Sequence, residues 1–328
     1  MAKVLLTTLQ PPTATWHLGR YELFRLSIAL SGEGKHQITC DPEAADIILF
    51  CDEGPTPYLR SIRQSPLYRR YWQKCFVFDS EDAPIAFLPG VYASIEKNWH
   101  NRNWTRSGFY VHIAERSRFD FIPFEENAPW LYSFAGTCYH HPVREALKKI
   151  DDPRFHLVDT SGRMVFLYRE DDQAEVTAYK QTVRNSKFVL CPRGVGVSSI
   201  RLFETMRMGR VPVILSDDWV PPQGPLWEKF SVRVAEADVS QLPGLLASLE
   251  PQAAEMAALA RAQWEQWFSE SVLFETAVDW CLEIRAGGRC GSRLARGSKY
   301  LQYLRPGHFR NYFRIKLKAF LAARSAAK

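Results

Sequence analysis

The 328-residue sequence lacks the patterns that mark a chain as membrane-spanning, secreted or stabilised by metal. No run of about 18 apolar residues occurs, so no segment looks long enough to cross a bilayer. The apolar part of the N-terminus is too short for a secretory signal, and no small-residue cleavage site follows it. The seven cysteines form no C-x-x-C pair, which argues against zinc and thioredoxin-like sites. We therefore expect a cytoplasmic protein.

Two common nucleotide-binding patterns are also missing. No Gly-Lys-Ser/Thr follows a glycine-rich turn, so the chain has no P-loop, and the strict G-x-G-x-x-G spacing of a dinucleotide site does not occur. The composition, with 46% hydrophobic and 24% charged residues, is that of a globular protein. At about 100–200 residues per domain, the length indicates two domains.

Positive charge is concentrated at one end of the chain. The formal net charge is +6, but residues 285–328 hold twelve Lys or Arg and no Asp or Glu. The remainder is left with 30 basic and 36 acidic residues, so a mildly acidic body carries a strongly basic tail. From Phe309 the tail reads as a helix with basic residues on one side, at Arg310, Arg314 and Lys318.

A basic amphipathic helix of this kind suits an anionic membrane surface. We therefore expect residues 285–328 to make peripheral contact with a membrane, which would be the inner membrane of a bacterium. Packing against the N-terminal domain and binding to another polyanion are the alternatives. Nucleic-acid binding is not expected, because no recognition motif accompanies the charge.

The first half alternates short apolar runs with helix-like stretches, as βαβ units do. Strands are predicted at Val4–Thr7, Asp46–Phe50 and Cys75–Phe78, and a helix at Tyr21–Leu30. The second and third strands are almost wholly apolar, as expected for parallel strands that are buried on two faces. Residues 98–126 show no clean period and are interpreted as loops with a short hairpin. Their interleaved aromatic and basic side chains predict either part of an acceptor groove or a loop pinned by buried tryptophans.

A second unit starts near Trp130. Its clearest stretch is a strand at Phe188–Leu190, a glycine-rich turn, a helix from about Ser199 to Met208 and a strand at Val211–Leu215. Further strands are predicted at Leu131–Ala135, Phe155–Val158 and Met164–Tyr168. The domains expected are 1–128, 129–270 and a segment of crossing helices and basic tail at 271–328, giving an α/β fold with mostly parallel sheets.

The glycine turn is the most informative segment. The free N–H groups of a helix that begins at Ser198 or Ser199 can hold phosphate, and Arg193 and Arg201 flank that point. Glu204 lies one turn further on, where a carboxylate can accept hydrogen bonds from ribose hydroxyls. The alternative is an ordinary strand–turn–helix with a serine N-cap and a surface ion pair between Arg201 and Glu204.

Residues 188–215, which end in Gly-Arg-Val-Pro-Val-Ile-Leu before Ser216-Asp217, resemble the signature block of exostosin-family glycosyltransferases. Trp219-Val-Pro-Pro222 and Trp227–Arg233 continue the resemblance, and looser matches at Cys75–Pro84 and Phe134–Thr137 precede it. The resemblance spans roughly residues 45–250 and is strongest between Cys191 and Ser216.

The resemblance implies a GT-B fold, in which two Rossmann-like domains face each other across a cleft. It implies an inverting transfer of sugar from a nucleotide donor held by the C-terminal domain, without an essential metal. The donor-binding residues that it implies are Arg193 and Arg201 on the diphosphate, Ser198 and Ser199 at the helix start, Glu204 on the ribose, and Gly136 and Thr137 closing on the phosphates.

Metal independence agrees with the absence of any strict Asp-x-Asp triplet, of which Asp79-Ser80-Glu81 is the nearest approach. We expect no metal and no cofactor, with the nucleotide sugar as substrate. The two arginines and the helix dipole then stabilise the leaving group.

An inverting transferase needs a base, and ligands lie beyond the carboxyl ends of parallel strands. Acidic residues at those ends repel one another, which raises the pKa of at least one. The candidates for the base are therefore Asp79 or Asp82, then Asp52, then His17. Each could instead be a loop acid or a helix cap, and His140 and His141 are predicted to be capping or surface residues.

The sequence therefore predicts a bacterial-type cytoplasmic transferase that adds sugar to a glycan or lipid-linked glycan during synthesis of a surface polysaccharide or glycoconjugate. The absence of an N-terminal membrane anchor favours a bacterial source. The alternatives are a fucosyltransferase-like enzyme that uses a different nucleotide sugar, and a non-catalytic glycan-binding partner subunit.

Overall fold

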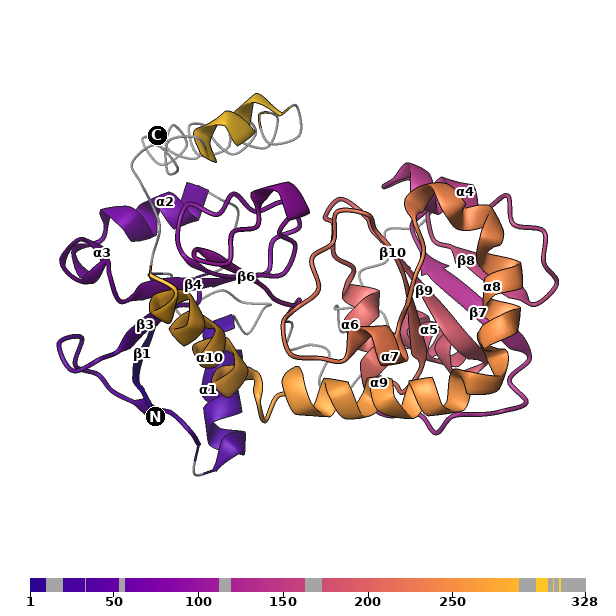
Figure 1. The fold of residues 1–328 in the computed structure, drawn as a ribbon, viewed down its shortest axis with the longest axis horizontal. Helices are drawn as coiled ribbons and strands as arrows, with labels where there is room; N and C mark the ends of the chain where they lie inside the picture. Colours follow the sequence, from indigo (N-terminus) through magenta and orange to yellow (C-terminus); the bar gives the residue numbers. More distant parts are fainter. Residues whose placement is uncertain are drawn as a thin grey trace.

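The computed structural model describes residues 1–9, 20–32, 34–52, 57–111, 119–162, 173–288 and 299–305, together with 309 and 313. They form two α/β units, each built on one parallel sheet, with α9 and α10 running along one side of both (Figure 1). No helix among the described residues is long and apolar enough to cross a membrane.

The N-terminal unit has a six-stranded sheet in the order β2-β1-β3-β4-β5-β6, and every pair is parallel. The strands are β1 (Lys3–Thr7), β2 (Gln37–Ile38), β3 (Ile47–Phe50), β4 (Cys75–Asp79), β5 (Gly90–Tyr92) and β6 (Thr105–Ser107). The helices are α1 (Arg20–Ser31), α2 (Pro57–Gln64) and α3 (Pro66–Tyr71). β3 and β4 are buried at every position, as their unbroken apolar runs predict.

The hairpin predicted between residues 98 and 126 is wrong for the described part of that interval. A short 3₁₀ turn (Lys97–Trp99) leads into β6, which pairs with β5 in parallel. Trp104 is buried, and its indole N–H donates to the carbonyl of Ala86 at 2.9 Å. The pinned loop is confirmed at Trp104, and Arg106 and Phe109 are buried beside it.

The C-terminal unit has a five-stranded parallel sheet in the order β11-β10-β9-β7-β8. The strands are β7 (Trp130–Gly136), β8 (Phe155–Asp159), β9 (Ser186–Pro192), β10 (Val211–Leu215) and β11 (Val232–Arg233). The helices are α4 (Pro142–Leu147), α5 (Gln173–Arg184), α6 (Ile200–Arg207), α7 (Trp227–Phe230), α8 (Leu242–Leu249) and α9 (Ala253–Trp267). The strand predicted at Met164–Tyr168 lies outside the described residues.

The predicted boundary at residue 128 assigned the residues just before Trp130 to the N-terminal unit. In the structure they pack with the C-terminal unit instead. Phe119 shares a buried cluster with Val176 and Tyr179 of α5, and the amide of Ile122 donates to the carbonyl of Met208 at 3.2 Å. The interval shows no helix or strand period, so the sequence carried no sign of this docking.

α10 (Leu273–Ala286) crosses back to the N-terminal unit and packs against α1 and β5 (Figure 1). The two units also meet directly through aromatic side chains. The ring of Phe109 lies 5.7 Å from that of Phe203 on α6 and 4.9 Å from that of Phe268 after α9. Because one continuous apolar cluster contains residues of both units, their relative position is held by burial.

Gly90 begins β5 with a φ of +157°, and a Cβ atom there would lie 2.0 Å from the carbonyl oxygen of Val77. We expect Gly90→Ala to lower the melting temperature by about 5–10 °C, roughly 3 kcal/mol of strain, because neither backbone can yield within a buried sheet. Gly244→Ala is the matched control, since a Cβ on that helical glycine meets nothing within 4 Å. Equal melting temperatures of Gly90→Ala and Gly244→Ala would contradict the close contact between Gly90 and Val77.

Candidate active site

The carboxyl ends of β7 and β9 and the start of α6 lie together, because β7 and β9 are neighbours in the sheet. β9 ends at Pro192, residues 193–199 turn, and α6 begins at Ile200 with Ser199 as its N-cap residue. Sequence and structure agree on this strand–turn–helix. Gly209 after α6 has a φ of +73°, as the C-terminus of a helix favours.

Two serine hydroxyls at the start of α6 are buried without hydrogen-bond partners. Ser198 and Ser199 are 4% and 6% exposed, and neither Oγ atom has a partner among the described residues. Ser199 is the N-cap residue of α6, as the alternative interpretation placed it, but its side chain makes no capping hydrogen bond. A buried hydroxyl without a partner costs about 1–3 kcal/mol, which a ligand bound at this helix end would recover.

Arg201 folds back over the end of β7. Its Nε donates to the carbonyl of Ala135, and a Cβ atom on Gly136 would lie 3.1 Å from its Nη2 atom. The guanidinium carbon lies 6.0 Å and 5.7 Å from the ring centres of Phe134 and Tyr179. The structure thus places Arg201 beside Gly136, and the surface position of the alternative interpretation is wrong.

Arg144 on α4 is a site residue to which no sequence pattern assigned a role. Its guanidinium donates to the carbonyls of Thr137, Pro192 and Arg193 and so ties the ends of β7 and β9 together. Burial, followed by the charge of nearby Arg201, lowers the pKa of Arg144 to about 10. Two guanidinium groups that oppose each other in this way form a site that an anion would stabilise.

Arg193 points differently from Arg201. Its guanidinium lies 3.7 Å from the carboxylate of Asp218 and 3.6 Å from that of Glu236. Its Nε atom is buried and has no hydrogen-bond partner among the described residues. Arg193 therefore already has acidic neighbours. The arginine whose pKa the charge of Arg201 lowers is Arg144.

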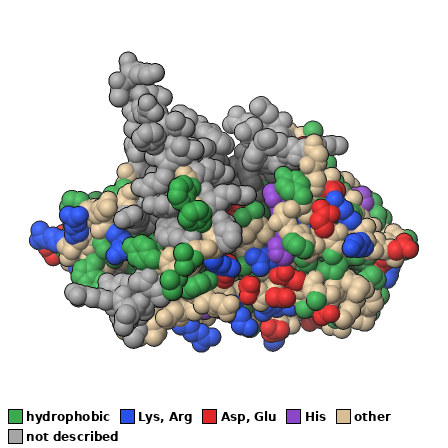
Figure 2. Space-filling view, turned by 90° about the horizontal axis from the view of Figure 1, so that it is seen from above, with side chains coloured by type: hydrophobic (Ala, Val, Ile, Leu, Met, Phe, Trp, Pro, Cys, Tyr) green, Lys and Arg blue, Asp and Glu red, His purple; other side chains and the backbone are tan. Residues whose placement is uncertain are grey.

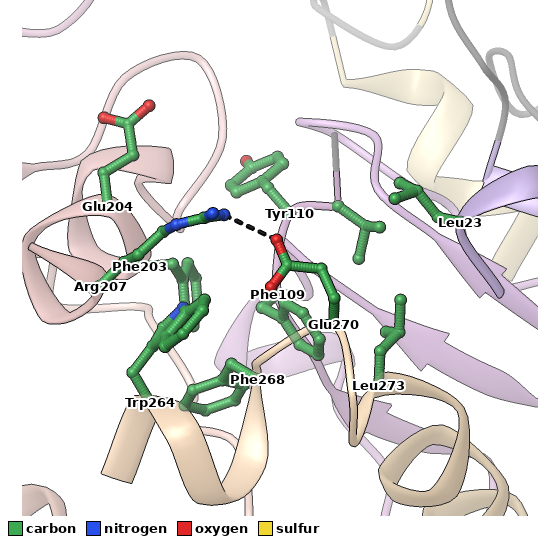
Figure 3. Close-up of a pocket in the computed structure, with 11 residues that line it drawn as sticks. Leu23, Phe109, Tyr110, Phe203, Glu204, Arg207, Trp264, Phe268, Glu270 and Leu273 are labelled. Carbon is green, nitrogen blue, oxygen red and sulfur yellow. Dashed lines mark hydrogen bonds and ion pairs between the residues drawn. The ribbon is translucent and has the colours of Figure 1, made fainter. Parts of the chain in front are cut away.

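Glu204 is 2% exposed and accepts a hydrogen bond of 2.8 Å from the hydroxyl of Tyr179. It borders a cavity of about 40 Å³ between the units, across which Arg207 pairs with Glu270 at 2.8 Å (Figure 3). Such a cavity holds a few waters at most. The ribose role of Glu204 stays a prediction, and Tyr179 occupies one of the two oxygens of this carboxylate.

In the N-terminal unit, a buried arginine separates the acidic strand ends. Arg20 of α1 donates to the carbonyls of Asp52 and Phe78, at 2.7 Å and 2.9 Å, and its guanidinium lies 3.5 Å from the carboxylate of Glu81. Asp79 is 1% exposed, and its pKa is raised by burial, while Arg20 opposes that shift. The predicted rise is correct, but its main cause is burial and not repulsion between acids.

Asp52 is also buried, and it accepts hydrogen bonds from Thr8 and from the amide of Leu9. Both Asp52 and Asp79 thus lie inside the N-terminal unit, where an acceptor would have to displace protein atoms to reach them. The remaining candidate, His17, lies outside the described residues.

Among the predicted acids, Asp82 is the one that the fold brings to the turn at residues 193–199, between β9 and α6. It is exposed, and its Oδ1 accepts a hydrogen bond of 2.8 Å from Tyr110. A Cβ atom on Gly196 would lie 2.4 Å from the carbonyl oxygen of Asp82, so the two backbones touch across the units. The charge of Asp82 also acts on Arg144 and His140, which places all three in one neighbourhood.

The two adjacent histidines differ in role. His141 is the N-cap residue of α4 and accepts a hydrogen bond of 3.3 Å from the amide of Val143, as predicted. His140 is largely exposed. Partial burial of its ring, followed by the charge of Arg144, lowers its pKa. Figure 2 shows histidine side chains among acidic and basic ones on the face of the molecule seen from above.

Among the residues that the structure describes, no group of three or more His, Cys, Asp or Glu side chains could hold a metal ion.

Two Rossmann-like units with parallel sheets, joined across a shared interface by a chain that crosses back through α10, define the GT-B class of glycosyltransferase fold, as the sequence analysis expected. The Anabaena protein HepE, solved in complex with UDP, overlaps 85% of this chain and 99% of its own at 11% identity, with a TM-score of 0.38. That score is too low to add to the assignment, which rests on the sheets.

Residues 109–249 match the family model of the Exostosin GT47 domain, and this match confirms the family resemblance. A probable glycosyltransferase of Arabidopsis thaliana is 34% identical over 137 residues, or 40% of this chain. Exostosin-1 of Drosophila melanogaster is 29% identical over 174 residues, or 47% of this chain. The chain spans 24% and 22% of the lengths of these two relatives, which come from a plant and an insect.

The raised pKa of the buried Asp79 side chain can be tested through the pH dependence of stability. Because its folded pKa lies above the ordinary value of 3.8, the folded state binds more protons than the unfolded state above that pH, and stability falls as pH rises. Asp79→Asn removes this dependence. We expect its melting temperature relative to wild type to rise between pH 4 and pH 7, measured by calorimetry; a constant difference would contradict the raised pKa.

Proposed function

We propose that this chain is an inverting glycosyltransferase that takes a sugar from a nucleoside-diphosphate donor without a catalytic metal. The observation that carries the proposal is the start of α6, where the buried hydroxyls of Ser198 and Ser199 have no partner in the described part of the chain. Arg201 and Arg144 lie beside it, with their guanidinium charges acting on each other. A diphosphate matches this set of donors and positive charges.

In the proposed reaction, the bond from the anomeric carbon to the diphosphate breaks as the acceptor oxygen attacks from the opposite side. Negative charge develops on the departing diphosphate, where Arg201, the serine hydroxyls and the N-terminal dipole of α6 stabilise it. Gly136 lets Arg201 lie close to the end of β7, and Thr137 lies in the same turn. Arg193 reaches the diphosphate in this proposal by leaving Asp218 and Glu236.

We assign Asp82 as the base that takes the proton of the acceptor hydroxyl. It is exposed, it comes from the unit opposite the donor site, and its backbone touches the Gly196 turn. Asp79 and Asp52 are buried, which favours a structural role for both. The acceptor proposed is a glycan or lipid-linked glycan.

Donor binding is tested by thermal shift with UDP, GDP, ADP and dTDP. We expect one of them, at about 100 times its dissociation constant, to raise the melting temperature of wild type by several degrees, since such binding adds about 2.7 kcal/mol. Arg201→Ala should lose most of this shift, and Arg184→Ala, which removes an exposed arginine paired with Glu125, should keep it. If none of the four stabilises wild type, the transferase proposal fails.

Base catalysis is tested by the rate at which the protein hydrolyses the sugar nucleotide whose diphosphate it binds. We expect Asp82→Asn to lower kcat by about 10²–10⁴-fold, the usual contribution of a positioned base, with the donor KM little changed. The matched control is Asp151→Asn. Asp151 is exposed and precedes β8, which is an edge strand of the C-terminal sheet. Full activity of Asp82→Asn would show that Asp82 is not the base.

We also propose that residues 285–328 bring the protein to an anionic membrane surface from the cytoplasmic side, where a lipid-linked acceptor would lie. Phe309 and Phe313 support this proposal, because both rings are more than half exposed and lie 4.7 Å apart. Flotation with vesicles containing anionic lipid should be lost on truncation at Arg285. Equal flotation of both chains would contradict the proposal.

A further inference from the structure

One hydrogen-bond path connects the proposed base to the proposed donor helix across the two units. The hydroxyl of Tyr110 donates to Oδ1 of Asp82 at 2.8 Å. Ser94 makes a side-chain hydrogen bond with the same Tyr110 hydroxyl. The Oγ atom of Ser94 in turn accepts a hydrogen bond of 3.3 Å from the amide of Ser198, just before α6.

Each N–H or O–H group along this path donates its proton to the oxygen of the next residue. The Ser198 amide donates to Ser94, whose hydroxyl proton is then directed to the Tyr110 oxygen, and the Tyr110 proton goes to Asp82. Burial raises the pKa of Tyr110 well above its ordinary value, so this hydroxyl keeps its proton at neutral pH. Each bond in such a chain polarises the next.

The path exists only while the units are in contact. Ser94, Tyr110 and Asp82 belong to the N-terminal unit, and Ser198 belongs to the C-terminal unit. The contact is close, because a Cβ atom on Gly196 would lie 2.4 Å from both the Ser94 Oγ and the Asp82 carbonyl oxygen. Tyr110 also lines the small cavity between the units, so its ring is held by the shared interface (Figure 3).

We propose that Ser94 and Tyr110 are positioning residues, which orient the Asp82 carboxylate for the acceptor proton when the units close on the donor helix. This inference rests on the proposed function, since Asp82 is the base only if the chain transfers sugar. Separation of the units would remove the Ser198 amide from Ser94 and leave the Ser94 hydroxyl free to turn. The base would then be correctly oriented only in the closed state.

Single and double variants test the positioning role through a separation of kcat from KM. We expect Tyr110→Phe to lower kcat for sugar-nucleotide hydrolysis about tenfold, the value of one hydrogen bond to a charged group, with the donor KM within about twofold of wild type. Ser94→Ala should lower kcat about threefold to tenfold. Because both act through one path, the double variant should match Tyr110→Phe alone.

Two controls remove similar hydrogen bonds that do not lead to Asp82. Tyr92→Phe deletes a buried tyrosine hydroxyl that donates to the carbonyl of Leu88, and Ser107→Ala deletes a serine that donates across the units to the carbonyl of Val220. Both should keep the wild-type kcat. Equal losses in the controls, multiplying losses in the double variant, or a raised KM at constant kcat would each overturn the proposal.

Hydrogen exchange at the Ser198 amide tests the first link without any substrate. We expect Ser94→Ala to speed that exchange at least about tenfold and Ser107→Ala to leave it unchanged, because this amide donates to Ser94 and not to Ser107. Unchanged exchange in Ser94→Ala would show that the link is absent. Failure of nucleotide binding in wild type would instead defeat the proposed function, so the two failures are distinguishable.

Discussion

Contact between the two units at the Gly196 turn is the constraint on which the candidate site depends. The turn between β9 and α6 touches the backbone of Asp82, and no side chain larger than that of glycine fits at position 196. The aromatic cluster of Phe109, Phe203 and Phe268 holds the units in this position. Apolar burial at the interface therefore brings the proposed base to the proposed donor site.

Charge within the candidate site is arranged in a way that favours binding of an anion. Arg144 and Arg201 lie close enough for each charge to affect the other, and Arg144 cannot move away because it holds three backbone carbonyls. The buried serine hydroxyls at the start of α6 add donors without acceptors in the described part of the chain. The N-terminal unit does the opposite: Arg20 neutralises the acidic strand ends. The acidic strand ends of the N-terminal unit thus have a positive partner, whereas Arg144 and Arg201 on the donor side face each other.

Particular residues show how far sequence reasoning reached into the site. The start of α6 follows from a local strand–turn–helix pattern, because such a pattern is encoded by neighbours in the chain. The place of Gly136 in the same site was implied only by the family resemblance. Asp79 and Asp82 are three residues apart and looked equivalent, yet one is buried and the other exposed. Arg20 and Arg144 act on segments distant in sequence, so no local pattern could assign their roles.

The sequence by itself determined the parallel α/β units, the strand, turn and helix at β9 and α6, and the family, because apolar periodicity, glycine placement and a contiguous motif are local properties. Only the tertiary structure decided which acid faces the turn, which arginine stands beside Arg201, and that Ser94 and Tyr110 connect the units. Those relations join side chains that are far apart in the chain. They are set by how two separately folded surfaces pack together, which no single segment encodes.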